Sequence, residues 1–154
     1  MTIVAVVALS GGPTGPTVAQ AAQLATQPAT APAPPPLGNT GAKLALAVQG
    51  VSFPNLASSG WHASGVRHGH VGGRAATVVF YSKGARRIGY VIVSGSVLAH
   101  PGGGQTSTIG GAQYQTLRLS NHLAVTWQSG GHTCIMLGEA SRAELLDLAS
   151  WSVS

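Results

Sequence analysis

The chain has 154 residues, with eight basic and three acidic side chains and a formal net charge of +5 at pH 7. Only 7% of its residues are charged, against about 25% in a typical soluble domain, which argues against a fold built on salt-bridged helices. The length accommodates one ordinary domain and a tail. The basic residues are scattered and do not form the dense stripe typical of nucleic-acid binders, so we expect no nucleic-acid partner.

The N-terminus begins with a short apolar run, MTIVAVVAL, that ends at a Ser-Gly-Gly-Pro sequence. A membrane-spanning helix needs about 20 apolar residues, and this run is too short. We interpret residues 1–12 as the outer end of a transmembrane segment whose beginning is missing. Two alternatives remain: a signal peptide cleaved near Ala21, although no Lys or Arg precedes the run, and a frayed terminus or short edge strand.

Residues 13–42 carry no charge and are rich in Ala, Pro and Thr. The proline-rich run 32–36 favours extended polyproline conformation, so we predict a stalk. Residues 17–26 could hold a short helix, for which we expect little packing surface. Cytoplasmic loops beside a span are usually enriched in Lys and Arg. Their absence here predicts a single-pass cell-membrane protein with everything after the span on the extracytoplasmic side.

From Lys43 onward, short apolar runs alternate with Gly-containing turns, a pattern typical of antiparallel strands. We expect a hairpin at Ser82–Ala85, a second hairpin through residues 120–122, and a further turn at Gly130-Gly131. The predicted strands are 60–70, 75–81, 88–93, 114–119, 123–127 and 133–137.

The last segment predicts a helix, because Ser141 and Glu144 have the spacing of a capping box. Leu145, Leu148 and Ala149 then share one helical face, with Leu146 beside them, and need an apolar surface to cover. The predicted fold class is α+β, mainly β: an antiparallel β-meander sheet in residues 43–154, with a C-terminal helix packed on one face.

The only cysteine, Cys134, lies two residues after His132. A single cysteine excludes an internal disulfide, and the absence of any CxxC pair excludes a cysteine-rich zinc module. Strand residues two apart share a face but lie about 7 Å apart, too far for easy formation of the thiol–imidazole hydrogen bond that activates a nucleophile. Because Ile-Met-Leu follows Cys134, we predict a buried core side chain.

Three histidines, His62, His68 and His70, have the same parity on the predicted strand 60–70. Two or three imidazoles could therefore converge on a transition metal, and an alternative is exposed histidines that respond to pH. The three acidic residues all lie in the last segment, so carboxylate ligands and paired-carboxylate catalysis are not available nearby. We predict no metal site, no cofactor and no enzymatic activity.

Other candidate features have plain structural alternatives. The run Gly102–Gly104 lacks the spacing of a phosphate-binding loop and indicates an ordinary loop. The tryptophans at 61, 127 and 151 are expected in the core more than on a binding platform. A cluster of basic residues, Lys83, Arg86 and Arg87, is a possible surface for an acidic partner, although charges at hairpins usually serve solubility and edge protection.

Several runs together resemble the extracytoplasmic C-terminal domain of actinobacterial membrane-anchored anti-sigma factors. They include Phe53-Pro54-Asn55-Leu56, Gly60-Trp61, residues 73–81, 87–93, 116–118 and 125–127, and Gly131-His132-Thr133-Cys134. The resemblance covers roughly residues 50–151, and the apolar end and stalk fit the same layout.

The resemblance implies a sensory or regulatory domain that links an envelope signal to transcription control without catalysis. In this family a cytoplasmic domain holds the sigma factor, and the chain lacks that domain, so a sigma factor would be reached only through it. The membrane is an expected partner through the N-terminal segment, and the ligand or protein partner of the ectodomain is not implied. The alternative is an exported β-rich module that binds a cell-envelope ligand; a second alternative is an enzyme using Cys134 or the histidines.

Overall fold

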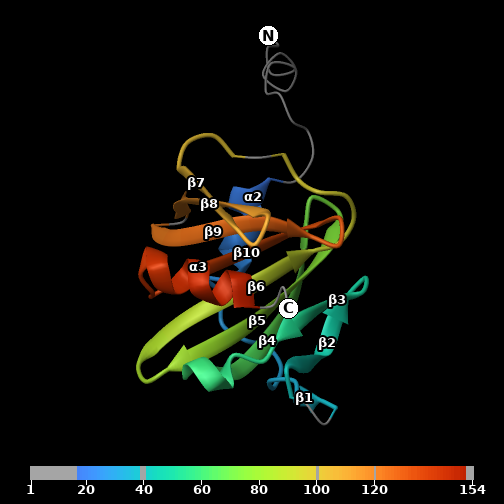
Figure 1. The fold of residues 1–154 in the computed structure, drawn as a ribbon. Helices are drawn as coiled ribbons and strands as arrows, with labels where there is room; N and C mark the ends of the chain where they lie inside the picture. The colour runs from blue at the N-terminus through green and yellow to red at the C-terminus, as the bar shows by residue number, and fades with distance from the viewer. Residues whose placement is uncertain (1–16, 39–40, 100, 120, 152–154) are drawn as a thin grey trace.

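The computed structural model describes residues 17–38, 41–99, 101–119 and 121–151. Its main body is a seven-stranded antiparallel sheet with the order β4-β5-β6-β10-β9-β8-β7 (Figure 1). The strands are β4 (His62–Val71), β5 (Arg74–Lys83), β6 (Arg86–Val93), β7 (Gln105–Ile109), β8 (Ala112–Leu119), β9 (His122–Ser129) and β10 (His132–Gly138). The predicted antiparallel sheet and its predicted hairpins are confirmed, whereas β7 was not predicted.

The sheet consists of two successive meanders, β4 to β6 and β7 to β10. After β6 the chain crosses to the far edge of the sheet, where β7 lies, and the second meander returns until β10 pairs with β6. The join lies in the middle of the sheet, with Cys134 opposite Ile92 and Ile135 opposite Val91. The hydrophobic core therefore depends on strands separated by about 40 residues of chain.

The C-terminal helix α3 (Arg142–Trp151) covers one face of the sheet. The predicted capping box is confirmed, because the backbone N–H of Glu144 donates to Ser141 Oγ and that of Ser141 donates to Glu144 Oε1. The four side chains predicted to face the sheet are buried: Leu145, Leu146, Leu148 and Ala149. The side chain of Trp151 lies outside the described part of the structure.

A small three-stranded sheet completes the α3 side. Its strands are β1 (Pro36–Leu37), β2 (Lys43–Val48) and β3 (Val51–Pro54), in that order, followed by the 3-10 turn η1 (Ala57–Ser59). Phe53 and Leu56 are fully buried in the same cluster as α3. The hydroxyl of Tyr81 donates to the carbonyl of Pro54 at 2.7 Å, which fixes the small sheet to β5.

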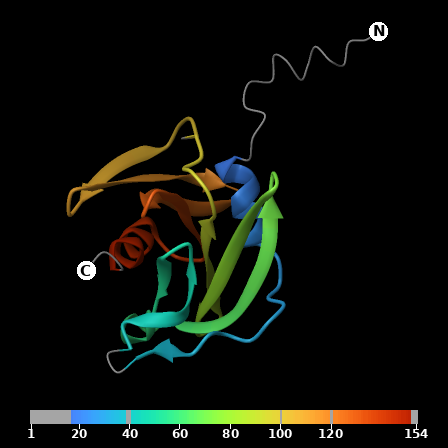
Figure 2. The same ribbon diagram turned by 90° about the vertical axis from the view of Figure 1, so that its right-hand side faces the viewer.

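The opposite face is covered by α2 (Val18–Leu24), so the two helices lie on opposite sides of the strands (Figure 2). Val18, Ala21, Ala22 and Ala25 are buried against it. The expectation that a helix here would have little to pack against is therefore wrong. The structure places residues 17–38 on the β-rich unit, whereas the sequence pattern assigned them to a stalk; residues 1–12 lie outside the described residues.

Two patterns in the sequence indicate that α2 forms and packs on the sheet. Thr17 and Gln20 form a reciprocal capping box, and the buried residues follow the i, i+3, i+4, i+7 spacing of one helical face. Neither α2 nor α3 is long and apolar enough to cross a bilayer.

Candidate functional site

Two glycines of the sheet allow the N-terminal segment to pack closely against it. A Cβ on Gly89 of β6 would lie 2.7 Å from the Cβ of Ala25, and a Cβ on Gly65 of β4 would lie 2.5 Å from that of Ala29. Neither glycine has the left-handed backbone that glycine favours, so close approach is the physical reason for glycine at both places. We call residues 17–31 the docked segment.

Hydrogen bonds extend this seat beyond the helix. The backbone N–H groups of Thr30 and Ala31 donate to the carbonyl of Val66, and that of Val66 donates to the carbonyl of Ala31. The docked segment thus pairs with β4, at one edge of the large sheet. Arg67 adds a side-chain hydrogen bond to the carbonyl of Pro28 at 2.9 Å.

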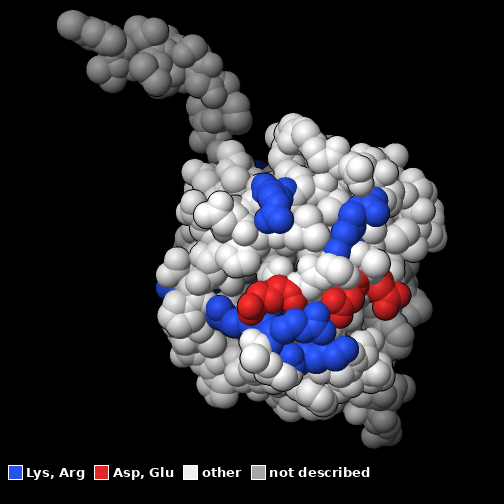
Figure 3. All heavy atoms as spheres, turned by 90° about the vertical axis from the view of Figure 1, so that its left-hand side faces the viewer, with Lys and Arg blue, Asp and Glu red and all other residues white. Residues whose placement is uncertain are grey.

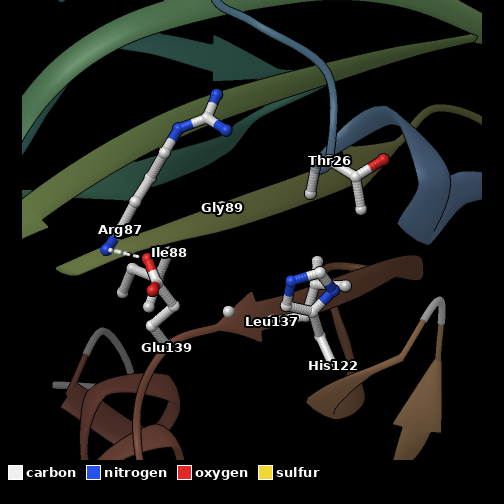
Figure 4. Close-up of a pocket in the computed structure, with 9 residues that line it drawn as sticks. Thr26, Arg87, Ile88, Gly89, His122, Leu137 and Glu139 are labelled. Carbon is white, nitrogen blue, oxygen red and sulfur yellow. Dashed lines mark hydrogen bonds between the residues drawn. The ribbon is translucent and has the colours of Figure 1, made fainter.

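A small cavity of about 100 Å³ lies where the docked segment meets the sheet. We call it the junction cavity. Ala25 and Thr26 form one wall, and the sheet supplies the rest: Arg87, Ile88, Gly89, His122, Leu137, Gly138 and Glu139. In Figure 4 the imidazole of His122 lies across the opening from Thr26. The volume accommodates on the order of three water molecules or a small ligand.

Arg87 holds the two sides of the junction cavity together. Its guanidinium donates to the carbonyl of Gln27 at 2.7 Å and lies 3.8 Å from the centre of the Phe80 ring. Burial lowers the pKa of Arg87, and the negative charge of Glu139 acts in the opposite direction. The Arg87 side chain therefore links the docked segment to the sheet, and we call this contact the Arg87 clamp.

Glu139 is fixed beside this clamp through the backbone. Its carboxylate accepts from the Arg87 backbone N–H at 3.1 Å, and its own N–H donates to the Arg87 carbonyl at 3.0 Å (Figure 4). Glycine at position 138 permits this close approach of the two strands, because a Cβ there would collide with the carbonyl oxygen of Arg87. The junction cavity thus combines a positive charge, a negative charge and an imidazole around an apolar floor.

Two residues of the predicted partner surface (Lys83, Arg86 and Arg87) make contacts within the chain. Arg87 binds the docked segment, and Arg86 forms a two-point ion pair with Glu144 at 2.9 and 3.3 Å. Arg86 also lies 5.1 Å from the centre of the Trp61 ring. The basic and acidic side chains lie next to one another on the surface (Figure 3). They form a mixed patch in place of a uniformly positive one.

The expected common face of His62, His68 and His70 is wrong. The register of β4 shifts between Ala63 and Gly65, and a bulge reverses which face the following residues occupy. His62 is opposite Ser82 whereas His68 is opposite Thr77, so His62 lies on the α2 face and the other two on the α3 face. In the described ranges, no group of three or more His, Cys, Asp or Glu residues could hold a metal ion.

The predicted burial of Cys134 is confirmed. Its side chain is fully buried in the α3-side core, and burial raises the pKa of its thiol to about 12. The thiolate that a nucleophile requires is therefore suppressed at neutral pH. His132 is anchored elsewhere, through a hydrogen bond between its Nδ1 and the carbonyl of Gly95.

No family model, curated protein or solved structure matches this chain. The resemblance to anti-sigma ectodomains thus stays a prediction.

Proposed function

We propose that this chain is the regulatory extracytoplasmic domain of a membrane-anchored anti-sigma factor, and that it acts without catalysis. In this proposal the folded domain senses an envelope signal, and the docked segment transmits its state toward the membrane. Contact with the sigma factor would come from a cytoplasmic region outside the chain.

The observation that carries the proposal is the set of contacts between the docked segment and the sheet. The docked segment is bound to the sheet by Gly–Ala contacts, three backbone hydrogen bonds to Val66 and the Arg87 clamp. A ligand or partner that binds the sheet more tightly in one of the two arrangements, docked or undocked, would shift the balance between them. This gives the domain a physical route for changing the exposure of the segment next to the membrane.

The chemistry of the ionisable groups also supports a non-catalytic role. Arg86 and Glu144 satisfy one another, Arg87 and Glu139 are held by the backbone, and the Cys134 thiol is buried.

The test uses the native gene in its own cells, with genome-wide transcript levels as the readout. Gly89→Ala places a methyl group against Ala25 and should release the docked segment. We expect transcripts of one sigma-dependent set of genes to change several-fold together. Gly102→Ala is the matched control, because a Cβ there meets nothing within 4 Å.

A second measurement locates the protein by cell fractionation and by protease added outside the cell. Membrane retention with an accessible domain is the expected result. The proposal fails if Gly89→Ala leaves the transcript profile unchanged although the segment is released in the purified protein. Recovery of a cleaved product in the medium would instead favour an exported binding module.

A further inference from the structure

A second cavity, of about 260 Å³, lies at the other end of the sheet, over β7, β8 and β9. It is lined by Thr106, Gln113, Tyr114, Gln115 and Thr126. Thr106 is directly opposite Gln115, and Gln115 is directly opposite Thr126. Cross-strand partners share a face, so hydroxyl, amide and hydroxyl form a row across three strands. We call this site the polar pocket.

The orientation of the Gln115 amide is fixed by the neighbouring loop. Its NH₂ group donates to the carbonyls of Pro101 and Gly103 at 2.8 and 2.7 Å. Because two carbonyl oxygens can face only the NH₂ end, the other end must be the carbonyl oxygen. This Oε1 is buried and has no hydrogen-bond partner among the described residues. A buried acceptor without a donor is costly, and a ligand that donates to it from the adjoining pocket would relieve that cost.

The loop that orients Gln115 is itself held in place by Gly104. This residue has φ +81, and a Cβ there would collide with the backbone oxygen of Thr116. Gly104 therefore packs closely onto β8, whereas a Cβ on Gly102 or Gly103 would meet nothing within 4 Å; the run agrees with the ordinary loop predicted from the sequence. The site wall it supports is preformed, which lowers the entropic cost of binding.

The remaining polar groups add to the surplus of acceptors. The Thr126 hydroxyl donates its single proton to the carbonyl of Cys134 at 3.0 Å, so it can offer only lone pairs. Thr106 and Gln113 are exposed and can both donate and accept. None of the residues that line the pocket is charged. A charged ligand would lose hydration without gaining a counter-charge.

We propose that the polar pocket binds a neutral polyhydroxylated ligand of about the size of one sugar ring. Its hydroxyls would donate to Gln115 Oε1 and Thr126 Oγ1 and exchange hydrogen bonds with Thr106 and Gln113. The volume lies just below the range of about 300–1,000 Å³ for drug-sized ligands, which fits a single ring. The inference concerns binding alone and holds whether or not the domain regulates a sigma factor.

The test is titration of the isotope-labelled full chain with four monosaccharides, followed by amide NMR shifts. Glucose and N-acetylglucosamine are the neutral probes, and glucosamine and glucuronate are the charged ones. We expect saturable shifts on β7, β8 and β9 with at least one neutral sugar, at a Kd on the order of 1 mM because few contacts are made. Binding of the charged sugars should be several-fold weaker.

Two variants test the assigned residues. Thr106→Val removes an exposed hydroxyl without changing the shape of the side chain and should weaken binding about five-fold, the effect of one hydrogen bond. Thr116→Val is the matched control: its buried hydroxyl also lacks a partner among the described residues but lies on the α3 face. Its Kd should match that of the wild type.

The proposal is overturned if no neutral sugar gives saturable shifts, if the charged sugars bind equally well, or if Thr106→Val and Thr116→Val behave alike. These results would leave the transcript experiment untouched, so the two proposals fail separately.

Discussion

The two faces of the large sheet are packed in different ways. On the α3 face, large aromatic rings meet edge to face. The centre of the Tyr90 ring lies 5.4 Å from that of Phe53 and 5.3 Å from that of Trp127. On the α2 face, the helix contributes one valine and several alanines, and glycines of the sheet allow close approach.

This difference predicts that the segment on the α2 face is released more easily than the core on the α3 face. Large buried side chains contribute the most free energy on burial, whereas an alanine contributes little. We therefore expect α3 and the aromatic cluster beneath it to contribute more to the stability of the fold than α2 does. Packing on the α2 face depends on close contact between small residues, so a single added methyl group can disturb it.

Trp127→Ala should cost the most, because it removes a buried ring in contact with Tyr90 and Tyr114. We expect the free energy of unfolding to fall by about 3–5 kcal/mol, measured by urea denaturation followed by circular dichroism. Val97→Ala, at an exposed position, should change it by less than about 0.5 kcal/mol. Similar effects of the two substitutions would contradict a core centred on the α3 face.

Gly89→Ala should have an intermediate and local effect. The new Cβ overlaps with Ala25, and overpacking of this kind costs about 1–3 kcal/mol. Amide hydrogen exchange should accelerate at residues 18–31 and stay slow in β5, β6 and β10. Gly102→Ala should leave the exchange pattern unchanged. Equal acceleration in the docked segment and the sheet would show that the two unfold as one unit.

Glu144→Gln should have the smallest effect, because the ion pair with Arg86 is well exposed. The hydrogen bond from Arg86 lowers the pKa of Glu144 below its ordinary value of 4.5. The ionised form is thus favoured in the folded state, so its contribution is present above pH 4.5 and is lost as the pH falls through the lower folded pKa.

We expect Glu144→Gln to reduce the free energy of unfolding at pH 7 by about 0.5 kcal/mol and to flatten its decline as the pH falls below 4.5. Urea denaturation at several pH values measures both. Asp147→Asn, which removes the same charge from the same helix, controls for net charge. An unchanged pH profile in Glu144→Gln would show that the ion pair contributes nothing to acid stability.

Local patterns in the sequence predicted most of the elements correctly. The hairpin strands, the C-terminal helix with its Ser141–Glu144 cap, and the burial of Cys134 and Trp127 all follow from residues close together in the chain. Residue patterning also held the signal for α2, in the Thr17–Gln20 capping box. That signal was outweighed by the surrounding Ala, Pro and Thr, which suggested a stalk.

The candidate sites were harder to predict, because they join residues far apart in the sequence. The junction cavity needs Thr26, Arg87, His122 and Glu139 together, and no local spacing connects them. The three histidines show the opposite case: their spacing was regular, but one bulge in β4 placed His62 on the other face. Parity along a strand holds only as far as its register is unbroken.

The sequence by itself determined a mainly β fold poor in charge, because alternation and capping act over a few residues. Only the tertiary structure decided that β10 joins β6, that glycines of the sheet seat the docked segment, and that Arg86 and Arg87 are used inside the molecule. The physical reason is that packing and charge pairing depend on which surfaces meet, and that choice is made by the whole folded chain.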